Sequence, residues 1–430
     1  MLSEVIVRVE RRKPDGKFDC RAYTEVPIAG RCLITLVAAD SEAASHNAEL
    51  LQQAVEADLL SLSPKCRRQT DPATAASTPG SSIQGDPHWR KALILVGADV
   101  SRVFVDDLVR EWLGEDKRAR DVLPVYPLSS QNGIAALLGK EFSAPNAEFW
   151  EDSPREAVPA VFAVAGITRK DPRIFISYRR IDSQSLANQL FDALSHVRFD
   201  VFLDHYRVPP GGDFQARLTQ ELGDKSMVLL LESANLQDSE WTLYEVQTAK
   251  ACGLSIFALQ LPGGRPVAGI DPLARRQLAP ELFGGQFTQL SELGDAELVD
   301  VVRDIRRRHD QGLAYRRAIL QQSLEDALAL EGVPGYYWDD WGILHARPPG
   351  IKLSVEYLIW ITTRPPEVED FYRTYLAGHP KARGVVIGLS RLMQADRAQT
   401  ADWVAGLSRI VAVDEGKMKE AVAAIAKGSL

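Results

Sequence analysis

The sequence predicts an α/β protein in which a central domain with a parallel sheet is flanked by two further small α/β domains. Short apolar runs rich in β-branched residues alternate with segments of helical spacing, which is the order expected of parallel strands joined by helices. At 430 residues the chain is too long for one ordinary domain. Its hydrophobic content of 45% and charged content of 25% are typical of a soluble globular protein.

The N-terminal domain is predicted to cover residues 1–168. Residues 61–88 are rich in Ser, Thr, Pro, Ala and Gly and predict a long loop inside it. The other predicted elements are strands at 5–9 and 32–37, a helix at 43–60, a strand at 92–97, a helix at 103–113 and a strand at 122–126. The second block of this domain is either a degenerate relative of the central domain or an ordinary α/β unit.

The central domain is predicted to cover residues 169–310. A first strand ends near Ser177, and Asp182 and Ser183 are suited to cap the helix that follows, because their side-chain oxygens can accept from its first free N–H groups. The later elements are a strand at 199–203, a helix at 213–223, a strand at 227–231, a helix at 240–251 and a strand at 255–260. Right-handed crossovers between such strands place helices on both faces of the sheet.

The C-terminal part is predicted to begin with a connecting helix at residues 311–332. Residues 333–430 then form a third α/β domain, in which strands and helices alternate. The predicted elements are a strand at 355–362, a helix at 368–376, a strand at 385–389, a helix at 400–407, a strand at 410–413 and a helix at 418–425.

Polar residues gather at the strand ends of the central domain. The first strand runs into Ile176-Ser177-Tyr178-Arg179-Arg180, the second ends in Phe202-Leu203-Asp204, and the third leads to Trp241 and Glu245. In this order the segment resembles a Toll/interleukin-1 receptor (TIR) domain of the bacterial kind that consumes NAD. The resemblance covers residues 170–310, about a third of the chain. It implies a flavodoxin-like parallel sheet.

Trp241 and Glu245 are four residues apart and therefore share one face of a helix. A carboxylate beside an indole suits the cleavage of a glycosidic bond, because it stabilises the positive charge that develops on the sugar. By resemblance, Glu245 is the catalytic residue and NAD⁺ is the substrate, with no cofactor and no metal. The structural alternative is that a Trp and a Glu at this spacing lie on an ordinary solvated helix.

The resemblance also implies which side chains surround the dinucleotide, together with Trp241. Ser177 and Tyr178 would flank the nicotinamide, and Arg180 would approach a phosphate. Asp204 would help to set up the loop from Val208 to Asp213, which would contact a neighbouring protomer. Alternatives stay open: Tyr178 fits packing at a strand end, Arg180 fits pairing with nearby acids, and Asp204 fits a turn.

Glu232 departs from the pattern of the family, whose members often have a small or uncharged residue directly after the third strand. Its position predicts one of two roles. Either a second acid near the site biases ligand preference, or the side chain faces solvent.

Composition and spacing exclude several other classes of function. The formal charge of −8 argues against direct binding of nucleic acid or an anionic membrane. The four cysteines lack metal-ligand spacing, and residues 133–140 lack the spacing of a phosphate-binding loop. The chain opens with Met1-Leu2-Ser3-Glu4, which lacks the basic start of a signal peptide. A cytoplasmic protein is therefore expected.

The hypothesis that follows is a bacterial immune effector against phage whose central domain hydrolyses NAD⁺ and releases nicotinamide once protomers assemble. A cyclase that makes a cyclic ADP-ribose signal is one alternative. A scaffold that only recruits other TIR domains is another. The trigger is unknown, and the flanking domains are expected to sense it or to drive assembly.

Overall fold

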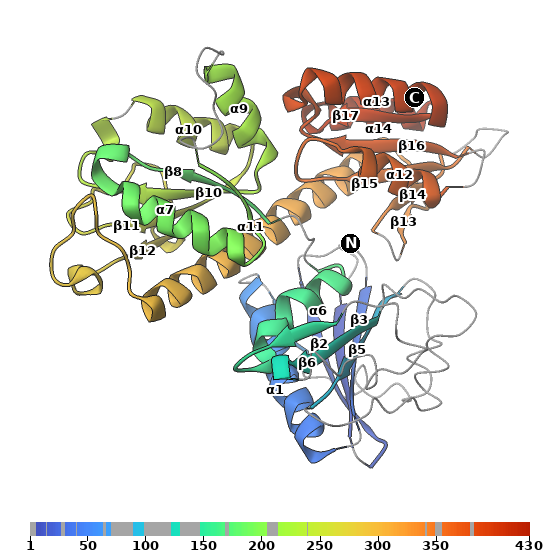
Figure 1. Ribbon diagram of the computed structural model, residues 1–430. Helices are drawn as coiled ribbons and strands as arrows, with labels where there is room; N and C mark the ends of the chain where they lie inside the picture. Colours follow the sequence, from blue (N-terminus) through green and yellow to red (C-terminus); the bar gives the residue numbers. More distant parts are fainter. Residues whose placement is uncertain are drawn as a thin grey trace. The chain divides into compact units, whose positions relative to one another are not determined.

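The computed structural model describes residues 6–13, 15–26, 31–39, 41–62, 66–69, 89–98, 122–129, 147–167, 172–203, 214–238, 240–339, 342–348, 355–378 and 382–430. Contacts among these residues divide the chain into two compact units. The first comprises Met1–Lys170 and Tyr337–Leu344, and the second comprises Asp171–Tyr336 and His345–Leu430. The predicted α/β class is confirmed for both (Figure 1). No helix in the described part is long and apolar enough to cross a membrane.

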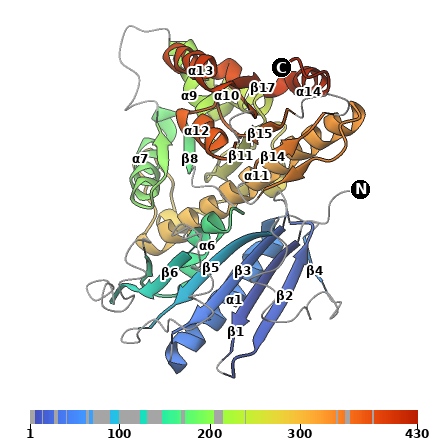
Figure 2. The ribbon, with the colours of Figure 1, turned by 90° about the vertical axis from the view of Figure 1, so that its right-hand side faces the viewer.

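The first unit is built on a mixed sheet with the strand order β4-β2-β1-β3-β5-β6-β7 (Figure 2). The strands are β1 (Ile6–Arg12), β2 (Phe18–Thr24), β3 (Arg31–Ala38), β4 (Arg67–Arg68), β5 (Trp89–Val96), β6 (Val122–Pro127) and β7 (Glu148–Trp150). β1 and β2 form an antiparallel hairpin, whereas β3 pairs parallel with both β1 and β5. The sequence prediction missed β2, although Asp15-Gly16 between the two strands is a pair that favours a hairpin turn.

Helix α1 (Glu42–Leu62) and helix α6 (Val158–Val164) belong to this unit. α1 corresponds to the helix predicted at 43–60, and Leu51, Val55 and Leu59 on one of its faces are fully buried. The predicted helix at 103–113 and most of the predicted loop at 61–88 lie outside the described residues.

The second unit contains the predicted central sheet, with the strand order β12-β11-β10-β8-β9. Its strands are β8 (Arg173–Ser177), β9 (Asp200–Phe202), β10 (Met227–Glu232), β11 (Ser255–Gln260) and β12 (Arg275–Gln277). The pairs β9–β8, β8–β10, β10–β11 and β11–β12 run parallel. The helices between them are α7 (Arg180–His196), α9 (Phe214–Asp224) and α10 (Glu240–Ala251). This is the predicted flavodoxin-like arrangement.

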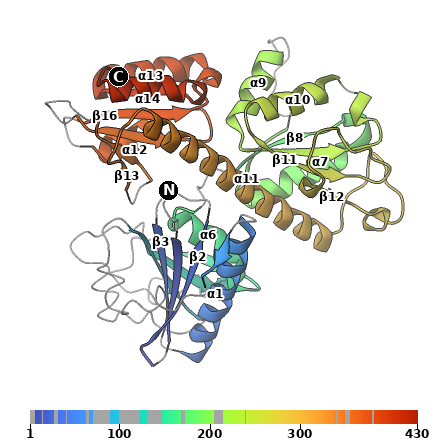
Figure 3. The ribbon, with the colours of Figure 1, turned by 180° about the vertical axis from the view of Figure 1, so that it is seen from behind.

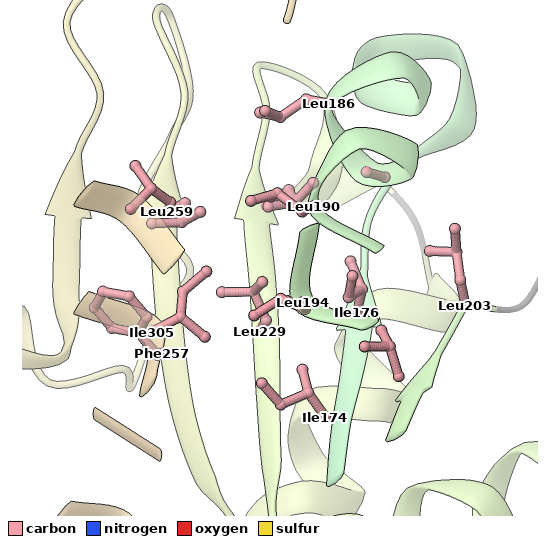
Figure 4. Packing of buried hydrophobic residues seen from close by; sticks show 14 of the residues in the cluster. Ile174, Ile176, Leu186, Leu190, Leu194, Leu203, Leu229, Phe257, Leu259 and Ile305 are labelled. Atoms are coloured by element: carbon pink, nitrogen blue, oxygen red, sulfur yellow. The ribbon is translucent and has the colours of Figure 1, made fainter. Parts of the chain in front are cut away.

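Side chains alternate between the two faces of this sheet, and the clusters that they join show which helices cover each face. Ile174 and Ile176 belong to a buried cluster that also contains Leu190 of α7 and Ile305 of α11 (Figure 4). Phe175 points to the other face, into a cluster with residues of α9 and α10 such as Leu222 and Ala249. Side chains alternate along a strand, so Ser177 follows Phe175 toward the α10 face and Tyr178 follows Ile176 toward the α7 face.

Helix α11 (Asp295–Leu330) runs from the central sheet to those strands of the C-terminal sheet that belong to the same unit (Figure 3). One helix thus contains both the end of the predicted central domain and the predicted connecting helix. The C-terminal sheet has the order β13-β14-β15-β16-β17. Its elements are β13 (Tyr337–Trp338), β14 (Leu344–Ala346), β15 (Tyr357–Ile361), α12 (Val368–Leu376), β16 (Arg383–Gly388), α13 (Ala395–Ser408), β17 (Ile410–Asp414) and α14 (Met418–Ala426).

The C-terminal sheet domain and the central domain share side-chain packing. Leu389, directly after β16, is fully buried in the same cluster as Phe175 and Ala249. Arg173 at the start of β8 forms ion pairs with Asp224 at 3.0 Å and with Glu367 before α12 at 2.7 Å. Because these contacts are buried or half-buried, the two domains support each other rather than being joined by a helix alone.

Candidate functional site

The candidate site lies at the carboxyl edge of the central sheet, between β8 and β10. The chain passes from β8 outward to β9 and then returns to β10 on the other side of β8, so the direction of winding reverses between β8 and β10. In open α/β sheets, ligands bind beyond the carboxyl ends of the strands at such a switch point. Ser177 ends β8 at this place, and the turn that leads to α10 follows β10.

Ser177 and Glu245 meet at this edge. Ser177 is 1% exposed, and its hydroxyl donates a hydrogen bond to Oε2 of Glu245. Thr242, Val246 and Ala249 form the buried side of helix α10. Their packing fixes the rotation of the helix about its own axis. Glu245 stands beside this buried side and is half-buried. The structure therefore brings together two of the residues that the sequence analysis selected, from elements 68 positions apart.

The remaining selected residues are placed as follows. Tyr178 packs against the buried cluster on the α7 face, which is the face opposite to Glu245. Arg180 is the first residue of α7 and is exposed, and its backbone carbonyl accepts from the side-chain amide of Gln289 at 3.2 Å. The backbone of Trp241 belongs to α10, but its side chain lies outside the described part. Asp204 and the loop from Val208 to Asp213 also lie outside it.

A comparison with protein families identifies this region. The family model described as TIR domain matches residues 174–286. The chain therefore contains a TIR domain. The match begins within β8 and extends past β12, so it covers the strands of the central sheet and the Ser177–Glu245 pair. A comparison with curated proteins found no match.

The sequence analysis missed a polar cluster in the TIR domain, here called the Asp182 cluster, which comprises Arg179, Asp182, Ser233 and Asn235. Oδ2 of Asp182 accepts from the hydroxyl of Ser233 at 2.7 Å, and Oδ1 accepts from the amide of Asn235 at 3.4 Å. Arg179 donates to the backbone carbonyl of Asn235 at 2.9 Å. Helix α7 begins at Arg180 and breaks at Ser183, whose φ is −150° and ψ 30°. The aspartate thus bonds to another loop, although the sequence suggested a helix cap.

The expectation that Glu232 faces solvent is wrong. Its side chain is fully buried at the end of β10, so it does not face solvent. Oε2 accepts from Nε of Arg275 at 2.6 Å, while Oε1 accepts from Nη2 of Arg275 at 3.0 Å and from the backbone N–H of Val267 at 2.7 Å. The hydrogen bond to Glu232 raises the pKa of the Arg275 guanidinium. Glu232 therefore fixes the loop between β11 and β12.

The cysteines of this chain are poorly suited to chemistry that depends on a thiolate. All four cysteines lie within the described part, and none of them forms a disulfide. Burial raises the pKa of Cys66 to about 11 and also raises the pKa of Cys20 and of Cys252. Because the thiolate is the reactive form, such thiols are poor nucleophiles near neutral pH. Among the described residues, no group of three or more His, Cys, Asp or Glu is arranged to hold a metal ion.

Proposed function

We propose that the TIR domain cleaves the bond between nicotinamide and ribose in NAD⁺. The hydrogen bond between Ser177 and Glu245 at the switch point carries this proposal. This hydrogen bond holds the carboxylate of Glu245 in a fixed orientation at the edge of the sheet where ligands of this fold class bind. The family match supports a TIR domain at residues 174–286 and carries no information on its activity.

The reaction asks little of the protein, because the cationic nicotinamide is already a good leaving group. As the bond between C1′ of the ribose and the ring nitrogen breaks, both bonding electrons leave with nicotinamide and positive charge develops on the ribose. The carboxylate of Glu245 stabilises that charge. Water then adds to C1′ and loses a proton, giving ADP-ribose.

Ser177 has an orienting role in this scheme. Its hydroxyl donates to one carboxylate oxygen of Glu245 and so restricts rotation of the carboxylate. A donated hydrogen bond also favours the charged form of a carboxylate, which is the form that stabilises a cation.

The test is chromatography of purified full-length protein with NAD⁺. We expect release of nicotinamide, and at least an approximately 100-fold loss in Glu245→Gln, because an oriented electrostatic group contributes on that order. Ser177→Ala should lose about tenfold, since a hydrogen bond to a charged group is worth about 1.5 kcal/mol. Glu281→Gln is the matched control, because Glu281 is an exposed acid elsewhere in the same domain. Full activity in Glu245→Gln would remove this residue from the mechanism.

The products decide between the enzyme classes. Linear ADP-ribose indicates hydrolysis, and a cyclic product indicates attack by a base nitrogen in place of water. Absence of nicotinamide at all protein concentrations, together with self-association, indicates a scaffold.

The proposed biological role is an immune effector of a bacterium against phage that is active when assembled. Self-association through the loop from Val208 to Asp213 would complete the site, and the flanking domains would receive the trigger. Turnover per protomer should then rise with protein concentration, together with the oligomeric state measured by sedimentation. Turnover that is constant while the oligomeric state changes would contradict activation by assembly.

A further inference from the structure

The Asp182 cluster connects the segment after β8, which includes Arg179 and the first turn of α7, to the loop after β10. Arg179 and Asp182 follow β8, whereas Ser233 and Asn235 follow β10. Hydrogen bonds run in both directions: Ser233 and Asn235 donate to Asp182, and Arg179 donates to Asn235. The first turn of α7 and the loop after β10 therefore cannot separate without breaking contacts that involve two charged side chains.

The cluster is partly shielded from water, which strengthens it. Ser233 is 2% exposed, and the side chain of Asp182 is 13% exposed. Hydrogen bonds to a charged group are stronger than neutral ones, and a low local dielectric strengthens them further. The bond between Ser233 and Asp182, at 2.7 Å, has the length expected for a hydroxyl donor and a carboxylate acceptor.

The loop after β10 leads directly into the helix that carries Glu245. Leu236 in this loop is fully buried and packs in one cluster with Val246, the neighbour of Glu245 in α10. The carbonyl of Ser233 accepts from the backbone N–H of Leu236 at 3.4 Å. A shift of the loop would therefore move the start of α10, and with it the carboxylate that Ser177 holds.

We propose that Asp182 is a positioning residue for Glu245. It holds the loop after β10 against the first turn of α7, and so keeps α10 at the distance at which Ser177 and Glu245 meet. This inference rests on the proposed function, because positioning matters for turnover only if Glu245 is the catalytic carboxylate. It assigns Asp182 no contact with the substrate.

The kinetic test compares three variants of the full-length protein. Asp182→Ala removes the acceptor, and we expect kcat for nicotinamide release to fall on the order of 10- to 100-fold with KM nearly unchanged, because small displacements of catalytic groups have effects of this size. Asp182→Asn keeps an oxygen that can accept from Ser233 and should recover most of kcat. Asp192→Ala is the matched control, because Asp192 is an exposed aspartate of the same helix. Wild-type kcat in a folded Asp182→Ala protein would overturn the proposal.

A second measurement does not depend on activity. Hydrogen–deuterium exchange should become faster in the backbone amides of residues 233–249 in Asp182→Ala, and should stay as in wild type in Asp192→Ala. If wild type releases no nicotinamide, the proposed function fails while this measurement still decides whether Asp182 holds α10. Unchanged exchange in this segment would overturn the positioning role in either case.

Discussion

Replacing Leu389 by alanine tests whether the C-terminal sheet domain is part of the core of the TIR domain. Leu389 is fully buried in a cluster with Phe175, Phe202, Val228 and Ala249. The substitution removes three carbon atoms, which at about 0.8 kcal/mol each give about 2.4 kcal/mol of lost transfer free energy. The cavity that remains adds to this, so a loss of about 3–4 kcal/mol in the free energy of unfolding is expected.

The assay is denaturant unfolding followed by tryptophan fluorescence. Leu407→Ala in α13 is the matched control, because Leu407 is 69% exposed and its removal should cost less than about 0.5 kcal/mol. Leu389→Ala should also lower nicotinamide release, since Phe175 and Ala249 lie in the strand and helix that hold Ser177 and Glu245. A loss as small as that of Leu407→Ala would refute the view that the two domains share a core.

Two further changes test the ionisable groups that the structure buries. Arg275→Met leaves the Glu232 carboxylate buried without its charged partner and should destabilise the protein by about 3–5 kcal/mol in the same unfolding assay. The double variant Glu232→Gln/Arg275→Met removes the buried charge as well and should recover much of this loss. Equal losses in the single and double variants would contradict the argument that Glu232 and Arg275 form a buried ion pair. For Cys66, the pKa is raised on folding from 9.0 to about 11, so the folded state keeps its proton longer. Its contribution to stability is present below pH 9 and is lost as the pH rises toward 11, by up to about 2 kcal/mol. Cys66→Ala should therefore show a smaller loss of stability over this window than wild type, and an identical pH dependence would refute the assignment.

Local sequence signals predicted most of the second unit. β10 is one apolar run, and α12 was predicted at its observed bounds, because both segments bury side chains with the period of their own secondary structure. The pairing of Ser177 with Glu245 was accessible only through resemblance to a family. No spacing in the sequence indicates which residue of α10 reaches the end of β8.

The parts that sequence reasoning missed depend on contacts between distant residues. Asp182 has the pattern of a helix cap, yet its acceptor oxygens are used by Ser233 and Asn235, more than 50 positions away. In the sequence Glu232 comes at the end of an apolar strand, a position that suggests an exposed side chain. In the structure Arg275 of β12 donates a hydrogen bond to its carboxylate. In both cases the order of the strands in the sheet brings the partner residue close. The periodicity of apolar residues in the sequence does not encode that order.

The same long-range contacts define the smallest part of the chain that can test the proposed function. A fragment ending near residue 310 would cut α11 and leave Arg173 without Glu367. It would also expose the cluster that Leu389 completes, directly behind β8 and α10. Altered turnover in such a fragment would therefore reflect the loss of core packing beneath Ser177 and Glu245 and would not by itself reveal a restraint by the flanking domains. Point substitutions in the full chain, at Asp182 or Leu389, change one side chain at a time and separate these causes.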